Sequence, residues 1–181
     1  MQIETERIIL RPWQESDAES LYRYAQDPEV GPAAGWQPHT SVENSREIIR
    51  GVLSDAGDFA ITLKGVDEAI GSISIMRKGH GSAPIQDDEA ELGYWIGKPY
   101  WGQGLVPEAV NALLGCCFTK LDCRGVWCAY YEGNEKSRRV QEKCGFVERC
   151  RAEVFCAPMN ERRMEIFNYI ARDRWEEMRG R

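Results

Sequence analysis

The clearest pattern in the chain is a run of apolar residues with helical spacing in its second half. Its apolar positions are Val106, Val110, Leu113, Leu114, Cys117 and Leu121. Residues at this spacing share one face, so the pattern predicts a long helix that buries this face. Pro107 and Glu108 suit the first turn, where a proline loses no hydrogen bond and a carboxylate meets the positive helix end.

Segments rich in β-branched and aromatic residues predict the strands, and capping residues mark other helices. The predicted strands are residues 7–13, 59–63, 69–76, 89–96, 125–131, 146–155 and 163–171. Further helices are predicted from residues 16–17 onward, after Ser41, from Asn134 to Cys144 and over residues 173–178. Residues 31–40 and 78–88 are expected to be loops. Hairpins and helical crossovers therefore alternate, which predicts an α/β (α+β) fold with a mixed sheet.

Length and composition are typical of one globular domain, predicted here over residues 1–181. The net charge of −6 argues against nucleic acid or an anionic membrane surface as the main partner. The first seven residues lack the apolar segment of a signal peptide, and no apolar run is long enough to span a bilayer. We therefore expect a cytoplasmic protein.

Seven cysteines are present, and none belongs to a C-x-x-C pair. Zinc spacing is thus absent, and no metal site is predicted. Most of the cysteines fall in apolar stretches, where a thiol packs as a small hydrophobic group. We expect reduced structural thiols, with a reactive or regulatory cysteine as the alternative.

Gly102 and Gly104 precede the predicted long helix and are the first candidates for a binding site. Glycine allows positive φ and a close approach of the backbone to a ligand. The helix that follows offers N–H groups and a positive dipole end, which together suit an anion such as phosphate. No Lys-Ser/Thr follows at the spacing of a Walker loop, and the third glycine of a dinucleotide-binding fingerprint is missing.

Two segments around these glycines and the Asn134 helix carry a family resemblance. Residues 94–96 and 101–109 resemble the acyl-CoA pyrophosphate loop of the GNAT superfamily of N-acetyltransferases, and residues 134–146 resemble its second cofactor segment. Residues 5–12 and 36–41 are similar to the branch that contains the ribosomal-protein N-terminal acetyltransferases. The resemblance implies a mostly antiparallel twisted sheet of about seven strands flanked by helices, with acetyl-CoA as co-substrate and no metal.

The same resemblance implies the residues that bind the cofactor. They are Tyr94, Trp95, Ile96, Trp101, Gly102, Gln103, Gly104, Leu105, Val106, Asn134, Ser137, Arg138 and Arg139. Tyr94 and Ile96 would pair the pantetheine amides through their backbone, as an added strand does. Arg138 and Arg139 would contact the ribose 3′-phosphate; alternatively, they form a solvated helix face. Trp101 and Val106 depart from the family's usual residues, but the loop binds phosphate mainly through backbone amides.

Acetyl transfer to an amine requires a neutral nitrogen, a stabilised oxyanion and a protonated or solvated thiolate. Glu91, on the strand that leads into the loop, is the candidate base, and Glu89 on the same strand face competes with it. Many family members have a tyrosine at the position of Gln141, thought to protonate the thiolate, and glutamine cannot take that role. Ser137 is the candidate that assists the departing thiolate, unless it serves only as a helix cap.

The sequence therefore predicts an N-acetyltransferase in which a primary amine attacks acetyl-CoA directly. The favoured acceptor is a protein or peptide α-amino group, which is easier to deprotonate than a lysine amine. A small amine, such as an amino acid, polyamine or amino-drug, and a non-catalytic acyl-CoA-binding module are the alternatives. Trp36 and His39 resemble the acceptor-site wall of the branch. The oligomeric state, monomer or homodimer, stays open.

Overall fold

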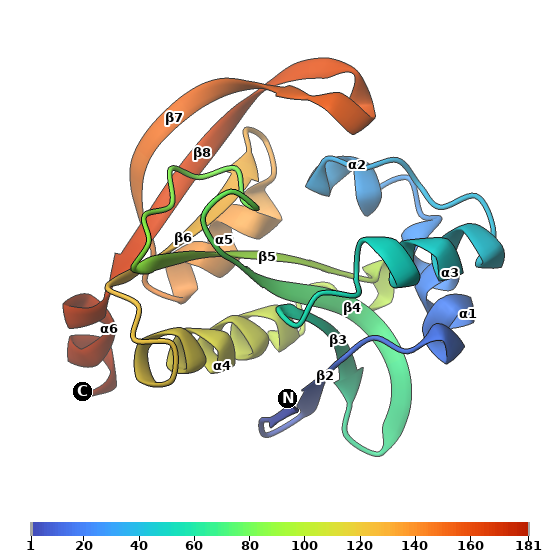
Figure 1. Ribbon diagram of the computed structural model, residues 1–181, viewed down its shortest axis with the longest axis horizontal. Coiled ribbons are helices and arrows are strands. Elements are labelled where there is room, and N and C mark those ends of the chain that lie inside the picture. The colour runs from blue at the N-terminus through green and yellow to red at the C-terminus, as the bar shows by residue number, and fades with distance from the viewer. Residues whose placement is uncertain (1, 181) are drawn as a thin grey trace. The chain divides into compact units, whose positions relative to one another are not determined.

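The computed structural model describes residues 2–180 of the chain (Figure 1). The helices are α1 (Ala18–Ala25), α2 (Gly31–Ala34), α3 (Val42–Gly51), α4 (Leu105–Thr119), α5 (Glu135–Lys143) and α6 (Arg172–Arg179). The strands are β1 (Ile3–Glu4), β2 (Ile8–Arg11), β3 (Asp58–Leu63), β4 (Val66–Met76), β5 (Glu89–Ile96), β6 (Gly125–Tyr131), β7 (Val147–Cys156) and β8 (Glu161–Ala171).

The chain divides into two compact units. Unit 1 is Met1–Ser74 with Tyr94–Ala109, and unit 2 is Ile75–Gly93 with Val110–Arg181. Strands β4 and β5 and helix α4 each begin in one unit and end in the other. The prediction of one domain over residues 1–181 stays a prediction.

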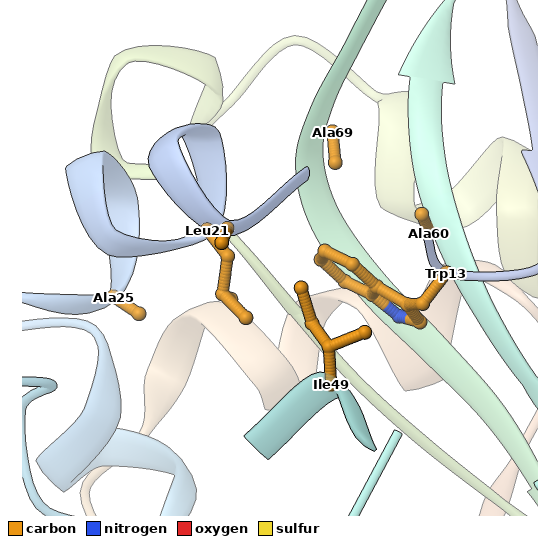
Figure 2. Close-up of a cluster of buried hydrophobic side chains, with 7 residues drawn as sticks. Trp13, Leu21, Ala25, Ile49, Ala60 and Ala69 are labelled. Carbon is orange, nitrogen blue, oxygen red and sulfur yellow. The ribbon is translucent and has the colours of Figure 1, made fainter. Parts of the chain in front are cut away.

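Unit 1 contains the antiparallel strands β1 to β4 in sequence order. Side chains from β3, β4, α1 and α3 form its apolar core together with Trp13, which precedes α1. Figure 2 shows this cluster, in which the labelled residues are Trp13, Leu21, Ala25, Ile49, Ala60 and Ala69. The Trp13 ring nitrogen donates a hydrogen bond to the hydroxyl of Ser72 at 3.3 Å, so the indole is both packed and oriented.

Unit 2 combines parallel and antiparallel strand pairs. The first half of β5 runs parallel to β6, and β8 is antiparallel to both β6 and β7. Strands β7 and β8 form the long curved hairpin drawn in orange and red in Figure 1. Asn160 in their connection has a φ of 51°, a left-handed conformation that asparagine tolerates better than most residues.

The fold class predicted from the sequence is confirmed: the described residues form a mixed, mostly antiparallel sheet with helices. Eight strands are present in residues 2–180 instead of about seven, because the two-residue strand β1 pairs with β2. The expected loop at residues 31–40 contains the short helix α2, which Pro32 helps to begin.

The predicted long helix is α4, and its central apolar residues are fully buried. Val110, Leu113, Leu114 and Cys117 are inaccessible to solvent. The assignment of Leu121 to this apolar face is wrong, because the helix ends at Thr119 and Leu121 is 44% exposed. Among the described helices, none is long and apolar enough to cross a membrane.

Candidate active site

The loop between β5 and α4, residues 97–104, is called the glycine loop below. It has the backbone conformation that its glycines predict. Gly102 and Gly104 have φ angles of 75° and 78°, in the left-handed region that favours glycine. The N–H of Glu108 donates to the carbonyl of Gly104 at 3.2 Å, which is the first hydrogen bond of the α4 ladder. The N–H groups of Leu105 and Val106 precede that bond at the positive end of the helix. The loop therefore has the geometry of an anion site.

Side chains within the loop fix its shape. The ring nitrogen of Trp101 donates to the carbonyl of Ile96 at 2.9 Å, and the amide of Gln103 donates to the carbonyl of Pro99 at 2.8 Å. Both side chains thus bind the loop backbone itself. The predicted cofactor contacts of Trp101 and Gln103 stay predictions.

A clamp from the turn between β1 and β2 holds the same loop, and the sequence pattern did not predict it. Arg7 donates to the Gln103 carbonyl at 2.9 Å and to the Glu108 carboxylate at 2.7 Å, and its backbone N–H also donates to Glu108. Thr5 donates to Glu108 as well. Burial acts to raise the pKa of Glu108, but these hydrogen bonds outweigh burial and lower it. A carboxylate in the first turn of α4 and an arginine in the opening segment were the only signals in the sequence.

The predicted acceptor residues Trp36 and His39 lie together in unit 1 with Trp95. The ring centroids of Trp36 and His39 are 5.3 Å apart, and those of Trp36 and Trp95 are 5.5 Å apart. The Nδ1 atom of His39 shares a 2.8 Å hydrogen bond with the hydroxyl of the buried Ser45. Burial lowers the pKa of His39, which favours a neutral ring at neutral pH. Trp36 and Trp95 are called the aromatic wall below. His39 packs against Trp36 and therefore supports this wall, and its predicted contact with an acceptor stays a prediction.

The cofactor residues predicted at the end of β5 differ in how far they are buried. Tyr94 and Trp95 are half-buried, whereas Ile96 is buried. The N–H of Gly97 donates to the carbonyl of Ile70 at 2.8 Å, which anchors the point where the chain leaves the strand.

Asn134 begins α5 as the sequence predicts. Its side-chain oxygen accepts a hydrogen bond from the N–H of Ser137 at 3.2 Å, which makes it the N-cap. Gly145 follows the helix with a φ of 88°. The cap uses the backbone of Ser137, so the hydroxyl of Ser137 is not the capping group.

Gln141 is a structural residue in unit 2. It is fully buried, accepts from the Asn168 amide at 2.8 Å, and donates to the Ala129 carbonyl at 3.1 Å and the Ser137 hydroxyl at 3.2 Å. It therefore links α5 to β6 and β8. Because the Ser137 oxygen accepts from Gln141, the hydroxyl hydrogen of Ser137 must point in another direction.

Gln141→Leu is expected to destabilise the protein, because leucine leaves the buried partners of Gln141 without their hydrogen bonds. We expect a loss of about 1–3 kcal/mol in the free energy of unfolding, measured by urea denaturation. Gln26→Leu, at an exposed position, is the matched control and should change this value little. Equal stability of the two variants would contradict the structural role of Gln141.

Glu89 and Glu91 are both buried on β5, but their surroundings differ. Glu89 accepts hydrogen bonds from four donors: Trp127 at 2.8 Å, Arg124 at 2.9 Å, Tyr169 at 3.1 Å and the N–H of Gln86 at 3.1 Å. Burial opposes ionisation of Glu89, but the four donors outweigh it and lower its pKa. A carboxylate held in this way is a weak base.

Glu91 is 3% exposed and accepts from the Ala83 N–H at 2.9 Å and the Ser82 hydroxyl at 3.1 Å, and the backbone of Ser82 is a further donor. Burial raises the pKa of Glu91, and these donors only partly offset it. A raised pKa brings a carboxylate closer to the value that suits a general base near neutral pH. Of the two candidates, Glu91 has the environment of a base.

The two candidate arginines of α5 are placed differently. Arg138 forms ion pairs with Glu135 at 2.6 Å and Glu142 at 2.8 Å on its own helix. Arg139 is exposed. To bind a phosphate, Arg138 must give up its ion pairs with Glu135 and Glu142. The alternative that Arg138 belongs to a solvated helix face therefore stays open.

Comparison with known proteins decides the family. Residues 7–147 match the family described as the acetyltransferase (GNAT) domain. The chain belongs to the GNAT acetyltransferase family. The match begins at Arg7 of the clamp and covers the glycine loop, Glu91 and the Asn134 helix.

Individual relatives agree with this family. The uncharacterized N-acetyltransferase p20 of Bacillus licheniformis is 31% identical over 148 residues, which are 78% of this chain and 80% of that protein. YdaF of Bacillus subtilis (strain 168), provisionally named a ribosomal N-acetyltransferase, is 41% identical over 64 residues, 35% of each chain. The crystal structure of Mycobacterium smegmatis RimJ in complex with CoA-disulfide has the same fold, with a TM-score of 0.74, 24% identity and coverage of 92% of this chain and 82% of that one. Of these three names, that of YdaF supports the ribosomal-protein branch that residues 5–12 and 36–41 resemble.

The cysteines of this GNAT chain are free thiols, and all but Cys150 are buried. Within residues 2–180, no three His, Cys, Asp or Glu side chains are grouped so that they could hold a metal ion.

Proposed function

We propose that the protein transfers the acetyl group of acetyl-CoA to a primary amine by direct attack. The observation that carries this proposal is Glu91, a buried carboxylate with a raised pKa that forms no salt bridge within residues 2–180, on the strand that leads into the glycine loop of a GNAT domain. Buried ionisable groups of this kind are costly and concentrate at functional sites. Glu91 is therefore the proposed general base.

Each unit by itself offers proposed cofactor contacts, the glycine loop in unit 1 and α5 in unit 2. The first amides of α4, at Leu105 and Val106, would hold the pyrophosphate, with Gly102 and Gly104 giving it room to approach. Asn134 and Ser137 would contact the pantetheine end, and Tyr94 and Ile96 would pair its amides. Acetyl-CoA is the co-substrate of GNAT enzymes in general, and the RimJ structure in complex with CoA-disulfide supports the same cofactor here.

The reaction needs three proton movements. Glu91 accepts a proton from the acceptor ammonium, directly or through water, and the neutral nitrogen then attacks the thioester carbon. The attacking nitrogen becomes positively charged as the new carbon–nitrogen bond forms, and it releases its second proton to solvent. The carbon–sulfur bond breaks in the tetrahedral intermediate, and the electron pair leaves with sulfur as the CoA thiolate. The hydroxyl of Ser137 is proposed to donate a hydrogen bond to this thiolate, which solvent finally protonates.

A protein or peptide α-amino group is the proposed acceptor. Its pKa of about 7.7–8.0 lies far below the value of about 10.4 for lysine, so a carboxylate with a raised pKa can deprotonate it near neutral pH. The name of YdaF, a ribosomal N-acetyltransferase by provisional naming, also favours a protein as the acceptor. The aromatic wall of Trp36 and Trp95 would flank the first side chain of the acceptor.

The test is release of free CoA thiol from acetyl-CoA with a panel of acceptors. The panel contains a lysine-free peptide with a free N-terminus, the same peptide with an acetylated N-terminus, an N-blocked peptide with one lysine, an amino acid, a polyamine and an amino-drug. Turnover with the first peptide alone supports the proposal. Turnover with only a small amine would show that the acceptor is a small molecule and not a protein or peptide α-amino group. A melting-temperature rise with acetyl-CoA but no turnover would favour a binding module.

Ser137→Ala is expected to lower kcat by about ten-fold, the effect of losing one hydrogen bond to a developing charge. The KM for acetyl-CoA should change less, because the bond strengthens as the thiolate forms. Steady-state thiol release measures both constants. Ser16→Ala, at an exposed position before α1, is the matched control. An unchanged kcat would exclude Ser137 from the chemical step.

A further inference from the structure

A single hydroxyl in unit 2 bridges two buried carboxylates. The Ser82 oxygen lies 3.1 Å from the Oε1 atom of Glu91 on β5 and 3.0 Å from the Oε1 atom of Glu165 on β8. Glu91 is 3% exposed and Glu165 is 6% exposed, whereas Ser82 belongs to an exposed turn. A Cβ added at Gly81 would collide with the Glu91 carboxylate, so the turn covers this side chain closely.

The number of hydrogens at this bridge restricts its protonation state. A serine hydroxyl has one hydrogen and can donate to only one of the two carboxylates. The other short contact is a hydrogen bond only if that carboxyl group is protonated and donates to the Ser82 oxygen. Glu91 already accepts the Ala83 N–H at 2.9 Å, which favours its ionised form, whereas Glu165 has no contact of this kind among the described residues. The consistent arrangement is a chain in which Glu165 donates to Ser82 and Ser82 donates to Glu91.

The surroundings of the pair offer no compensating charge. Within the described residues, neither Glu91 nor Glu165 forms a salt bridge. Trp127 on β6 lies opposite Glu91 in the sheet, and Tyr131 on β6 and Ala152 on β7 lie opposite Glu165.

The nearest charged side chains along these strands have other partners. Arg163 on β8 lies over the Tyr131 ring, with 5.0 Å to its centroid, and pairs with Glu161. Glu89 on β5 pairs with Arg124. Burial raises the pKa of Glu165, and the charge of Glu91 raises it further against the hydrogen bond from Ser82. Two ionised carboxylates on one hydroxyl, without a cation, would be strongly unfavourable.

We propose that Glu165 is protonated at neutral pH and acts through Ser82 as the positioning residue that keeps Glu91 ionised and oriented as the base. This proposal rests on the proposed function. Protonated Glu165 aims the Ser82 hydrogen at Glu91, and that hydrogen bond stabilises the carboxylate that must accept a proton from the ammonium. No proton needs to leave Glu165 during turnover, so a neutral donor can replace it.

The decisive variant is Glu165→Gln, because a glutamine amide donates to Ser82 as a protonated carboxyl group does. We expect kcat/KM at neutral pH within about two-fold of wild type and an unmoved acid limb of the pH profile. If Glu165 were ionised, the same substitution would remove a negative charge beside Glu91 and shift the acid limb to lower pH. If Glu165 were itself the base, activity would fall by about 10²-fold or more. Either result overturns the proposal.

Ser82→Ala removes the hydroxyl that links the carboxyl groups of Glu91 and Glu165. The ionised form of Glu91 then loses its only side-chain donor among the described residues, so its pKa rises and the acid limb should move to higher pH. An unmoved acid limb would contradict the role of Ser82. Glu148→Gln, an exposed carboxylate on the neighbouring strand, is the control and should leave the profile unchanged.

A second measurement is independent of activity. Carbon-13 NMR of protein labelled at the glutamate carboxyl carbons should show one protonated carboxyl group at neutral pH, absent in Glu165→Gln and retained in Glu148→Gln. Its absence from the wild type would refute the shared-proton arrangement even if no acceptor is turned over. A protein that shows this signal but has no activity with any acceptor would instead refute the proposed function.

Discussion

Gly104→Val is expected to abolish the stabilisation of the protein by coenzyme A. Gly104 has a φ of 78°, and apart from its chain neighbours the only described atom within 4 Å of an added Cβ is a guanidinium nitrogen of Arg7 at 3.4 Å. A valine there would occupy the approach of phosphate to the first amides of α4. Each lost hydrogen bond to a charged group costs about 1.5–3 kcal/mol, equivalent to about 10–150-fold in affinity. The melting-temperature rise with saturating coenzyme A measures the effect.

Gly65→Val provides the matched control for backbone strain. Gly65 has a φ of 81° in the turn between β3 and β4, and an added Cβ there meets no atom within 4 Å. Both variants should lose about 1–3 kcal/mol of stability from the strained conformation. Only Gly104→Val should lose the response to coenzyme A. An intact response in Gly104→Val would refute the loop as the phosphate site, and a lost response in both variants would assign the effect to strain.

Features that depend on local sequence could be predicted well. Asn134 and Gly145 delimit α5 because capping and left-handed termination involve residues within one or two turns. The glycine loop was also recognisable, since positive φ and an adjacent helix start are local properties. Strand β1 was missed because two residues contain no periodicity, and its existence depends on pairing with β2.

Features that depend on distant partners could not be predicted. Glu89 and Glu91 share a strand face and are equivalent in the sequence, but Trp127 and Tyr169 reach only Glu89. The clamp between Arg7 and Glu108 joins residues 101 positions apart. Such contacts follow from the order and register of the strands. The pattern of apolar and polar residues restricts both, but it does not determine which individual side chains meet.

Glu91→Gln is expected to lower kcat/KM by about 10²–10⁴-fold at neutral pH, the usual contribution of a general base. The loss should depend on pH in a defined direction. Above its raised pKa, Glu91 is ionised and can accept the proton of a charged amine. As the pH passes the pKa of an α-amino group, about 7.7–8.0, the amine loses its proton without help, and the difference between variant and wild type should shrink. Thiol release measured across this range tests the prediction, and a constant ratio would remove Glu91 as the base.

The stability of Glu91→Gln separates a catalytic loss from a folding defect. Because burial raises the pKa of Glu91 in the folded state, the folded protein binds more protons than the unfolded chain between the ordinary and the raised pKa. Wild-type stability attributable to this group is therefore present at low pH and is lost as the pH rises through the folded-state pKa. The neutral amide of Glu91→Gln avoids this loss, so the variant should be at least as stable as wild type at neutral pH while its activity is low.

Glu89→Gln should behave in the opposite way and identifies which carboxylate is the base. The amide would face donors from Trp127, Arg124 and Tyr169 with a donor of its own, at an expected cost of about 1–3 kcal/mol in the free energy of unfolding. Below its melting temperature, this variant should retain the pH profile of the wild type. If Glu89→Gln instead abolished activity without loss of stability, and Glu91→Gln did not, the roles of the two carboxylates would be reversed. Glu91→Gln should lose activity and keep its stability, whereas Glu89→Gln should lose stability and keep its pH profile of activity. The two variants together therefore identify the base.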